Sequence, residues 1–256
     1  MRFPSLFCVL SVLAFSITPA FSQRSLDAIA TSELPRLLET YKFLHRNPEI
    51  SFQEEKTSAF VAKELRNLGF TVTERVGQFE DTLRTSYGVV GVLKNGNGPT
   101  VLVRTDLDAL PVEEKTGLPY ASTVKTKDDA GREVSVMHAC GHDIHMTSFL
   151  GAATILSELK NQWKGTLVMI GQPCEERGAG ANAMLKGGLY TRFPRPDYVL
   201  ALHDNASMPA GQVGICEGFT LASVTSVDIV VRGVGGHGAY PHTTKDPVVL
   251  ASQIVL

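Results

Sequence analysis

The sequence has no block of like charges and almost no net charge. Its 256 residues include 24 Lys and Arg and 26 Asp and Glu, which gives a formal net charge of -2. Both signs are interspersed along the chain, so the sequence offers no electrostatic patch for nucleic acid or for anionic lipid. With 43% hydrophobic and 20% charged residues, the composition is typical of a globular chain with a sizeable core and excludes a disordered one.

An apolar run long enough to anchor the chain in a membrane is also missing. Residues 6–17 are apolar and follow Arg2, but a membrane-spanning helix needs about 20 apolar residues. Pro19 and the small-residue pattern Ala20-Phe21-Ser22 come next. This arrangement predicts a cleaved secretory signal peptide at residues 1–22, export to the periplasm or the extracellular space, and no stable membrane anchor.

Cysteine is scarce, with four in the chain. Cys8 leaves with the predicted signal peptide, and Cys140, Cys174 and Cys216 remain. An odd number of cysteines in an exported protein argues against a disulfide framework and leaves Cys140 free to bind a metal ion.

Predicted helices alternate with predicted strands through most of the chain. Apolar residues at helical spacing predict helices at residues 33–45 and 52–68. Two valine-rich segments, 87–94 and 100–105, are joined by Asn-Gly-Asn-Gly, which predicts a hairpin or a tight connection whose second strand is central and buried. A helix, a strand, a short helix and a strand are then expected at residues 146–160, 166–171, 181–186 and 198–202. The alternation favours a mostly parallel α/β sheet.

Polar side chains follow three of these strands directly. Asp106 and Asp108 come after the strand at 100–105, Glu175 and Glu176 after the strand at 166–171, and His203 after the last strand. In open α/β sheets, ligands bind beyond the carboxyl ends of the strands, so we expect these groups at one edge of the sheet. Taken alone, the glutamates also suit a solvated pair, and the aspartates also suit turn caps before Pro111.

The segment MHACGHDIH, residues 137–145, concentrates metal-binding side chains. Gly141 tolerates positive φ and can bend the backbone so that Cys140 and His142 face one point. Asp143 and His145 add possible ligands or groups that support the ligands. The alternative is a buried cysteine beside hydrogen-bonded core histidines. We expect Cys140, His142, Glu176 and His203, with Asp106 or Asp108 behind them, to form a site for one or two divalent ions.

Residues 233–238, GVGGHG, match the glycine pattern of dinucleotide-binding loops and follow an expected strand at 226–231. That fingerprint requires a helix that opens at its last glycines and an acidic residue about 20 positions later. Residues 239–242, AYPH, intervene, and the chain stops at Leu256. Nucleotide binding is therefore the less favoured interpretation.

Four motifs in order, TDLDALPVEE, MHACGHDIH, QPCEERGAGA and GVGGHGAYPH, resemble the metal-dependent amidohydrolases that include hippurate hydrolase and plant indoleacetyl-amino-acid hydrolases. They are also similar to aminoacylases and carboxypeptidases of the same metallopeptidase group. The resemblance runs from about His45 to the last residue. It implies a zinc-peptidase-like α/β fold, in which helices sandwich a mixed sheet, over residues 23–217. An incomplete α+β lid or dimerisation domain over residues 218–256, and a homodimer, are further implications.

The resemblance also implies roles for individual residues. Four positions match the metal ligands of the family: Cys140, His142, Glu176 and His203. Glu175 matches the general base and Asp108 the aspartate that supports the metal site. His237 matches a histidine that stabilises the oxyanion, reaching into the site of the other subunit. Cys174 stands where relatives carry a small residue, and we interpret it as inert filler, with an extra soft group near the metal as the alternative.

Together these features predict an enzyme that hydrolyses amide bonds in N-acyl amino acids or small peptides. Zinc, manganese, cobalt or nickel would activate water, with Glu175 as the base. The chain stops inside an expected helix at residues 246–256, where relatives continue and supply a further ligand histidine, so a truncated, inactive metal-binding fragment is the main alternative. A cysteine hydrolase that uses Cys140 and His142 is the third hypothesis.

Overall fold

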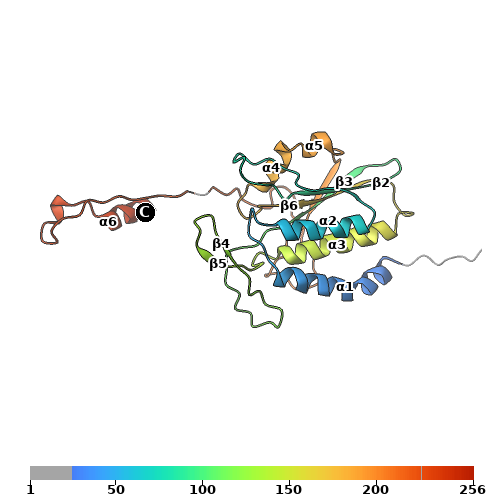
Figure 1. Cartoon of the computed structure of the whole chain (residues 1–256), viewed down its shortest axis with the longest axis horizontal. Helices are drawn as coiled ribbons and strands as arrows, with labels where there is room; N and C mark the ends of the chain where they lie inside the picture. Colours follow the sequence, from blue (N-terminus) through green and yellow to red (C-terminus); the bar gives the residue numbers. More distant parts are fainter. Residues whose placement is uncertain (1–24, 226) are drawn as a thin grey trace, which may run out of the picture. The chain divides into compact units, whose positions relative to one another are not determined.

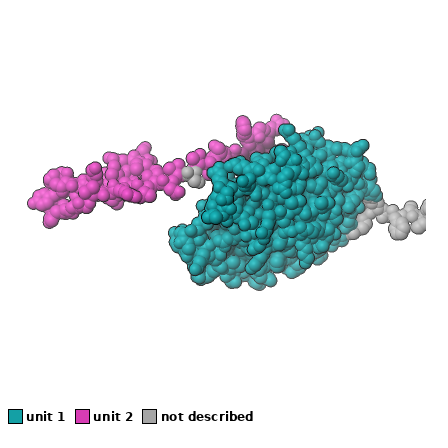
Figure 2. Space-filling view, turned by 45° about the horizontal axis from the view of Figure 1, so that its top comes forward, with its two compact units in different colours: residues 1–205 teal, residues 206–256 magenta. Residues whose placement is uncertain are grey.

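A computed structural model describes residues 25–225 and 227–256, so the predicted signal peptide lies outside the described residues. The chain divides into two compact units, Met1–Asn205 and Ala206–Leu256 (Figure 2). The expected domain boundary after residue 217 and the lid role of the second unit remain predictions.

A five-stranded mixed sheet forms the centre of the first unit, in the order β1-β2-β6-β3-β7. Its strands are β1 (Thr71–Thr73), β2 (Val89–Asn95), β3 (Thr100–Asp106), β6 (Gly165–Gln172) and β7 (Tyr198–Ala201). β1 pairs antiparallel with β2, and β2 with β6, whereas β3 lies parallel to both β6 and β7. Four of the five strands therefore run in one direction, as expected, and β2 runs against them, which confirms the mixed sheet implied by the family resemblance.

Of the two alternatives predicted for residues 87–94 and 100–105, the hairpin is wrong and the tight connection is confirmed. β2 and β3 are joined by a short turn, but β6 lies between them and pairs with both. A tight turn reverses the chain without requiring the two strands to share hydrogen bonds. β3 is an interior strand of the sheet, as expected.

Helices cover both faces of this sheet (Figure 1). On one face lie α1 (Leu26–Arg46), α2 (Glu55–Asn67) and α3 (His142–Glu158), and on the other α4 (Gly180–Lys186) and α5 (Leu189–Arg192). Side chains alternate along β6, as they must in a strand. Leu167 and Met169 pack with the first group of helices, and Val168 and Ile170 with the second. Buried apolar residues on both faces therefore hold the three layers together.

Two helices begin earlier than the sequence predicts. α1 starts at Leu26 because the Ser25 side chain accepts a hydrogen bond from the Ala28 N–H at 3.2 Å and caps the helix. α3 starts at His142, directly after Gly141 in the left-handed conformation. The short strands β4 (Lys125–Lys127) and β5 (Glu133–Ser135), which pair with each other, were not predicted.

The second unit contains η1 (Pro241–Thr243) and α6 (Pro247–Val255). Val234 and Lys245 form an isolated antiparallel bridge. Residues 227–231 form no strand and no helix opens at residue 238, so the glycine pattern at 233–238 lacks the strand and helix that a dinucleotide site requires. Among the described residues, every helix is too short or too polar to cross a membrane.

A buried ion cluster joins α1 to the first turn of α3. The His45 ring contacts Asp143 through Nδ1 at 2.7 Å and Glu114 through Nε2 at 3.0 Å. Ionised carboxylates accept hydrogen bonds but cannot donate them, so both ring nitrogens carry protons. Burial opposes this charge, but the hydrogen bonds to Glu114 and Asp143 raise the pKa of His45 above its usual value.

We expect His45→Leu to destabilise the protein in a pH-dependent way. The variant leaves two buried carboxylates without their shared cation, which should cost about 3 kcal/mol of unfolding free energy near pH 6. A histidine whose pKa rises on folding stabilises fully below its unfolded pKa of about 6.5 and stops doing so as the pH rises through its folded pKa. Urea titrations with a chelator should show the difference from wild type shrinking as the pH rises above about 6.5. A constant difference would contradict the charged state of His45.

Candidate metal centre

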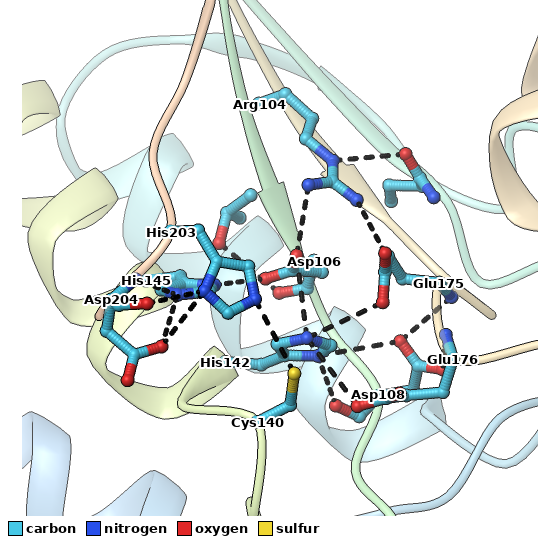
Figure 3. A network of polar contacts seen from close by, with 12 residues as sticks. Arg104, Asp106, Asp108, Cys140, His142, His145, Glu175, Glu176, His203 and Asp204 are labelled. Atoms are coloured by element: carbon cyan, nitrogen blue, oxygen red, sulfur yellow. Dashed lines mark hydrogen bonds and ion pairs between the residues drawn. The ribbon is translucent and has the colours of Figure 1, made fainter. Parts of the chain in front are cut away.

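The carboxyl ends of three strands bring the predicted site residues together (Figure 3). Asp106 ends β3 and pairs in register with Gln172, the last residue of β6. Asp108, the two glutamates and His203 follow β3, β6 and β7 within a few residues. Figure 3 shows the glutamates on one side of the His142 ring and His203 on the other.

The turn before α3 supplies Cys140, and the first residue of α3 is His142. Gly141 has φ of 74° and lies so close to Asp204 that a Cβ atom would be 2.3 Å from Oδ1 of that residue. The left-handed conformation favours glycine here, and a larger residue would also displace the Asp204 side chain. The N–H groups of Ile144 and His145 donate to the Gly141 carbonyl oxygen at 2.9 and 3.1 Å. His142 is therefore held by the helix itself rather than by a loop before it.

His142 presents one ring nitrogen to a group of carboxylates. Its Nδ1 lies 2.7 Å from the Asp108 carbonyl oxygen and donates to it, which leaves the Nε2 lone pair free. Nε2 lies 3.6 Å from Asp106 Oδ2, 3.6 Å from Glu175 Oε2 and 3.7 Å from Glu176 Oε1.

Two of these atoms, His142 Nε2 and Glu176 Oε1, are buried without a hydrogen-bond partner among the described residues, whereas Asp106 Oδ2 makes an ion pair with Arg104 at 3.0 Å. Buried polar atoms normally have partners, because an unpaired one costs about 1 to 3 kcal/mol. Imidazole nitrogen and carboxylate oxygens are ligands of zinc and related ions. Two ligand atoms that each lie about 2.1 Å from one ion are separated from each other by a distance similar to those between Nε2 and these carboxylate oxygens. The imidazole nitrogen and the carboxylate oxygens are therefore placed so that they could bind a divalent cation.

Cys140 and His203 form the other side of the site. Cys140 Sγ lies 3.5 Å from His203 Nε2, and His203 Nδ1 lies 2.7 Å from the Asp204 carbonyl oxygen, to which it donates. Ligand atoms of Cys140, His142 and His203 all lie within 4.8 Å of one another, as do those of His142, Glu175 and Glu176. The structure thus brings together all four residues that match the family's metal ligands.

The Cys140 thiol lacks the character of a nucleophile. Burial, with the charges of Glu176 and Glu175 added, raises the pKa of Cys140 to about 12. A catalytic cysteine has a lowered pKa, since the thiolate is the reactive form. The environment of Cys140 therefore argues against the cysteine hydrolase hypothesis.

Two further residues support the site: His145, which was expected as a possible ligand or supporting group, and Arg104, which was not. His145 Nδ1 lies 2.8 Å from Asp106 Oδ1, and its Nε2 lies 3.0 Å from Asp204 Oδ1. Arg104 contacts the other Asp106 oxygen at 3.0 Å and reaches Glu175 Oε1 at 4.0 Å. Burial opposes ionisation of Asp106, but the hydrogen bond from His145 and the charge of Arg104 lower its pKa to about 2. His145 stood in the metal-binding motif, whereas Arg104, inside a valine-rich strand, gave no signal beyond an unusual charge.

Asp108 supports the site without turning toward the cation position. Its Oδ1 accepts from the Glu175 N–H at 3.0 Å, and its Oδ2 accepts from the Glu176 N–H at 3.1 Å and from Ser51 Oγ at 2.6 Å. The carboxylate is fully buried. Asp108 therefore fixes the backbone of both glutamates instead of capping the turn before Pro111.

Two residues singled out in the sequence remain, Cys174 and His237. Cys174 is fully buried, and burial together with the charge of Glu54 raises its pKa, so the thiol stays protonated. That agrees with an inert side chain, although its backbone conformation is unusual, with φ of 50°. His237 belongs to the second unit, where it is exposed and its Nδ1 accepts from the Ala239 N–H at 3.1 Å. Its role in catalysis remains a prediction.

The chain matches known proteins over most of its length. The model of peptidase family M20/M25/M40 matches residues 102–254. An N-acetyl-L-cysteine deacetylase of Bacillus subtilis is 36% identical over 224 residues, which cover 86% of this chain and 49% of the relative. Thermostable carboxypeptidase 2 of Saccharolobus solfataricus is 40% identical over 221 residues, or 85% of this chain and 51% of that protein.

A solved structure agrees with these matches. The YXEP protein of Bacillus subtilis, a dinuclear metal-binding peptidase from the M20 family, superposes with a TM-score of 0.61 at 33% identity. The match covers 75% of this chain and 47% of that structure. The chain spans about half the length of the curated relatives it matches.

We expect Asp108→Asn to destabilise the first unit. Asparagine keeps one acceptor oxygen and places an NH₂ group against a backbone N–H, which should cost about 2 kcal/mol. Urea titrations in the presence of a chelator measure this loss. The matched control is Asp128→Asn, because Asp128 also accepts two backbone N–H groups, from Ala130 and Arg132, but in an exposed turn. Equal losses in both variants would contradict the supporting role of Asp108.

Proposed function

Because the chain belongs to peptidase family M20/M25/M40, we propose that it hydrolyses amide bonds in N-acyl amino acids or small peptides with a divalent metal ion as cofactor. The observation that carries this proposal is the convergence of two buried atoms without hydrogen-bond partners, His142 Nε2 and Glu176 Oε1, beside the Asp106 carboxylate. Two relatives support the amide class, since an N-acetyl-L-cysteine deacetylase and a carboxypeptidase both cleave such bonds by name.

Four residues would hold the cation: Cys140, His142, Glu176 and His203. They supply one thiolate, two imidazoles and one carboxylate, a set that suits one or two ions of zinc, manganese, cobalt or nickel. Such an ion polarises the amide carbonyl and lowers the pKa of the attacking water.

Glu175 is the proposed general base. Its side chain is 36% exposed, against 16% for Glu176, so a water molecule can reach the Glu175 carboxylate. Backbone hydrogen bonds to Asp108 hold both glutamates. Glu175 accepts the proton of the attacking water and returns it to the nitrogen of the leaving amine, while Glu176 serves as a ligand.

Three further parts of the proposal rest on the sequence. His237 donates a hydrogen bond to the oxyanion, a contribution worth about 3 kcal/mol in comparable sites. The segment 218–256 contributes to a homodimer, so that His237 serves the site of the other subunit. The chain is exported after cleavage of residues 1–22.

The first test removes the metal and then the base. We expect turnover of N-acetyl-L-methionine, N-acetyl-L-cysteine or hippurate to stop after exhaustive chelation and to return with zinc, manganese or cobalt. Glu175→Gln should lower kcat by about 10² to 10⁴ with metal content unchanged. Glu113→Gln is the matched control, because Glu113 is an exposed carboxylate that pairs with Lys115 on the surface.

Each assay is run on this chain and on the chain extended by the C-terminal segment of a relative, since the match covers about half of each relative. Full activity after chelation would overturn the metal mechanism. Turnover by the extended chain alone would favour the inactive-fragment alternative.

A second test follows the proton of Cys140. Metal ions bind the thiolate, so a thiol that is protonated at neutral pH must release its proton on binding. We expect Cys140→Ala to release about one proton fewer per zinc ion than wild type near pH 7. Calorimetry in buffers of different ionisation enthalpy measures this number, and equal proton release would show that the sulfur is not a ligand.

A further inference from the structure

Two buried carboxylates accept hydrogen bonds from three consecutive backbone N–H groups, those of Cys174, Glu175 and Glu176. The Cys174 N–H donates to Glu54 Oε1 at 2.7 Å. The next two N–H groups, of Glu175 and Glu176, donate to the two oxygens of Asp108 at 3.0 and 3.1 Å. In the turn that follows β6, Glu54 thus binds the first of these N–H groups and Asp108 binds the other two.

This turn is strained and is tied to a second strained segment. Cys174 has φ of 50° and Phe52 has φ of 70°, in the left-handed region that residues other than glycine rarely adopt. The Phe52 N–H donates to Cys174 Sγ at 3.1 Å. Such conformations cost about 1 to 3 kcal/mol each and persist only where surrounding contacts impose them. The contact of Glu54 with residue 174 is one of these contacts.

Glu54 occupies the N-cap position of α2 but makes no side-chain capping hydrogen bond. Glu49 serves that helix instead, because its Oε2 accepts from the Thr57 N–H at 2.8 Å and from Thr57 Oγ1 at 2.9 Å. The Glu54 carboxyl is therefore available for residue 174, which lies 120 positions away in the sequence.

Burial of a carboxyl group at the position of Glu54 is energetically unfavourable. The side chain is fully buried, and its Oε2 has no hydrogen-bond partner in the part of the chain that the structure describes. Burial, with the nearby charge of Asp108 added, raises the pKa of Glu54 to about 7. Capping does not account for a buried carboxyl here, whereas its contact with the turn of Glu175 and Glu176 does.

We propose that Glu54 is a positioning residue for Glu175 and Glu176, acting through the Cys174 N–H to hold the turn in its left-handed conformation. The inference rests on the proposed function, in which Glu175 is the base and Glu176 a ligand. When this hydrogen bond is absent, residue 174 relaxes toward an extended conformation and the carboxylates that follow it move. A displacement of about 1 Å at a reacting group can cost about 10²-fold in rate.

The test compares two substitutions of Glu54. Glu54→Met keeps the length of the side chain and removes the acceptor, whereas Glu54→Gln keeps an acceptor oxygen. With the best substrate of the N-acyl amino acid panel, we expect Glu54→Met to lower kcat by about tenfold or more with KM little changed. Glu54→Gln should restore most of kcat. Glu49→Met is the matched control, because it removes a carboxyl from the same segment without touching residue 174, and its kcat should stay near wild type.

Hydrogen exchange of the metal-free protein gives a readout that does not need turnover. Peptides that span residues 173–177 should exchange about tenfold or more faster in Glu54→Met than in wild type, and at the wild-type rate in Glu49→Met. If wild type hydrolyses nothing, the proposed function fails and this exchange rate alone decides whether Glu54 holds the turn. If Glu54→Met does not fold, Glu54→Asp replaces it, since the shorter side chain cannot reach the Cys174 N–H.

Three results would overturn the inference. The first is an unchanged kcat and exchange rate in Glu54→Met. The second is an equal loss of kcat in Glu54→Met and Glu49→Met, which would mean a general loss of stability. The third is a loss in Glu54→Gln as large as that in Glu54→Met.

Discussion

The parallel register of β3 and β6 is the constraint on which the site depends. Asp106 pairs with Gln172, so the two strands end at the same level. The chain after β3 and the chain after β6 therefore leave the sheet side by side, and Asp108 can accept hydrogen bonds from the backbone of Glu175 and Glu176. A shift of one residue would turn Asp106 and its neighbours to the opposite face, because side chains alternate along a strand.

The first turn of α3 connects this edge to the rest of the protein. His142 faces the carboxylates, Asp143 contacts His45 on α1, and His145 contacts Asp106 on β3. Three charged or polar side chains within four positions thus reach three different partners, and each is buried. Buried charges are tolerated only where they are paired, so these contacts specify the orientation of the helix as well as stabilise it.

Local sequence features were sufficient to predict much of this arrangement. The strands before Asp106, Glu175 and His203 were recognisable from their apolar runs, and Gly141 from its place between two potential ligands. The insertion of β6 between β2 and β3 was not predictable, because pairing depends on contacts between distant segments. Ser51 and Glu54 were missed for the same reason, because nothing nearby in the sequence indicates that their partners are Asp108 and Cys174. Arg104 was missed because it lies within a valine-rich segment that predicts a strand and indicates nothing further.

The contact between Glu54 and Cys174 also bears on the order in which the protein folds. It joins residues 120 positions apart, and Ser51 meets Asp108 across 57 positions. Closing such loops costs conformational entropy before any contact offsets it, so distant contacts form after local ones. Helices α1 and α2 can form early, whereas the turn that carries Glu175 and Glu176 acquires its shape only after β3 and β6 have paired. A chain whose sheet is not yet assembled therefore has no complete set of ligands to offer a metal ion.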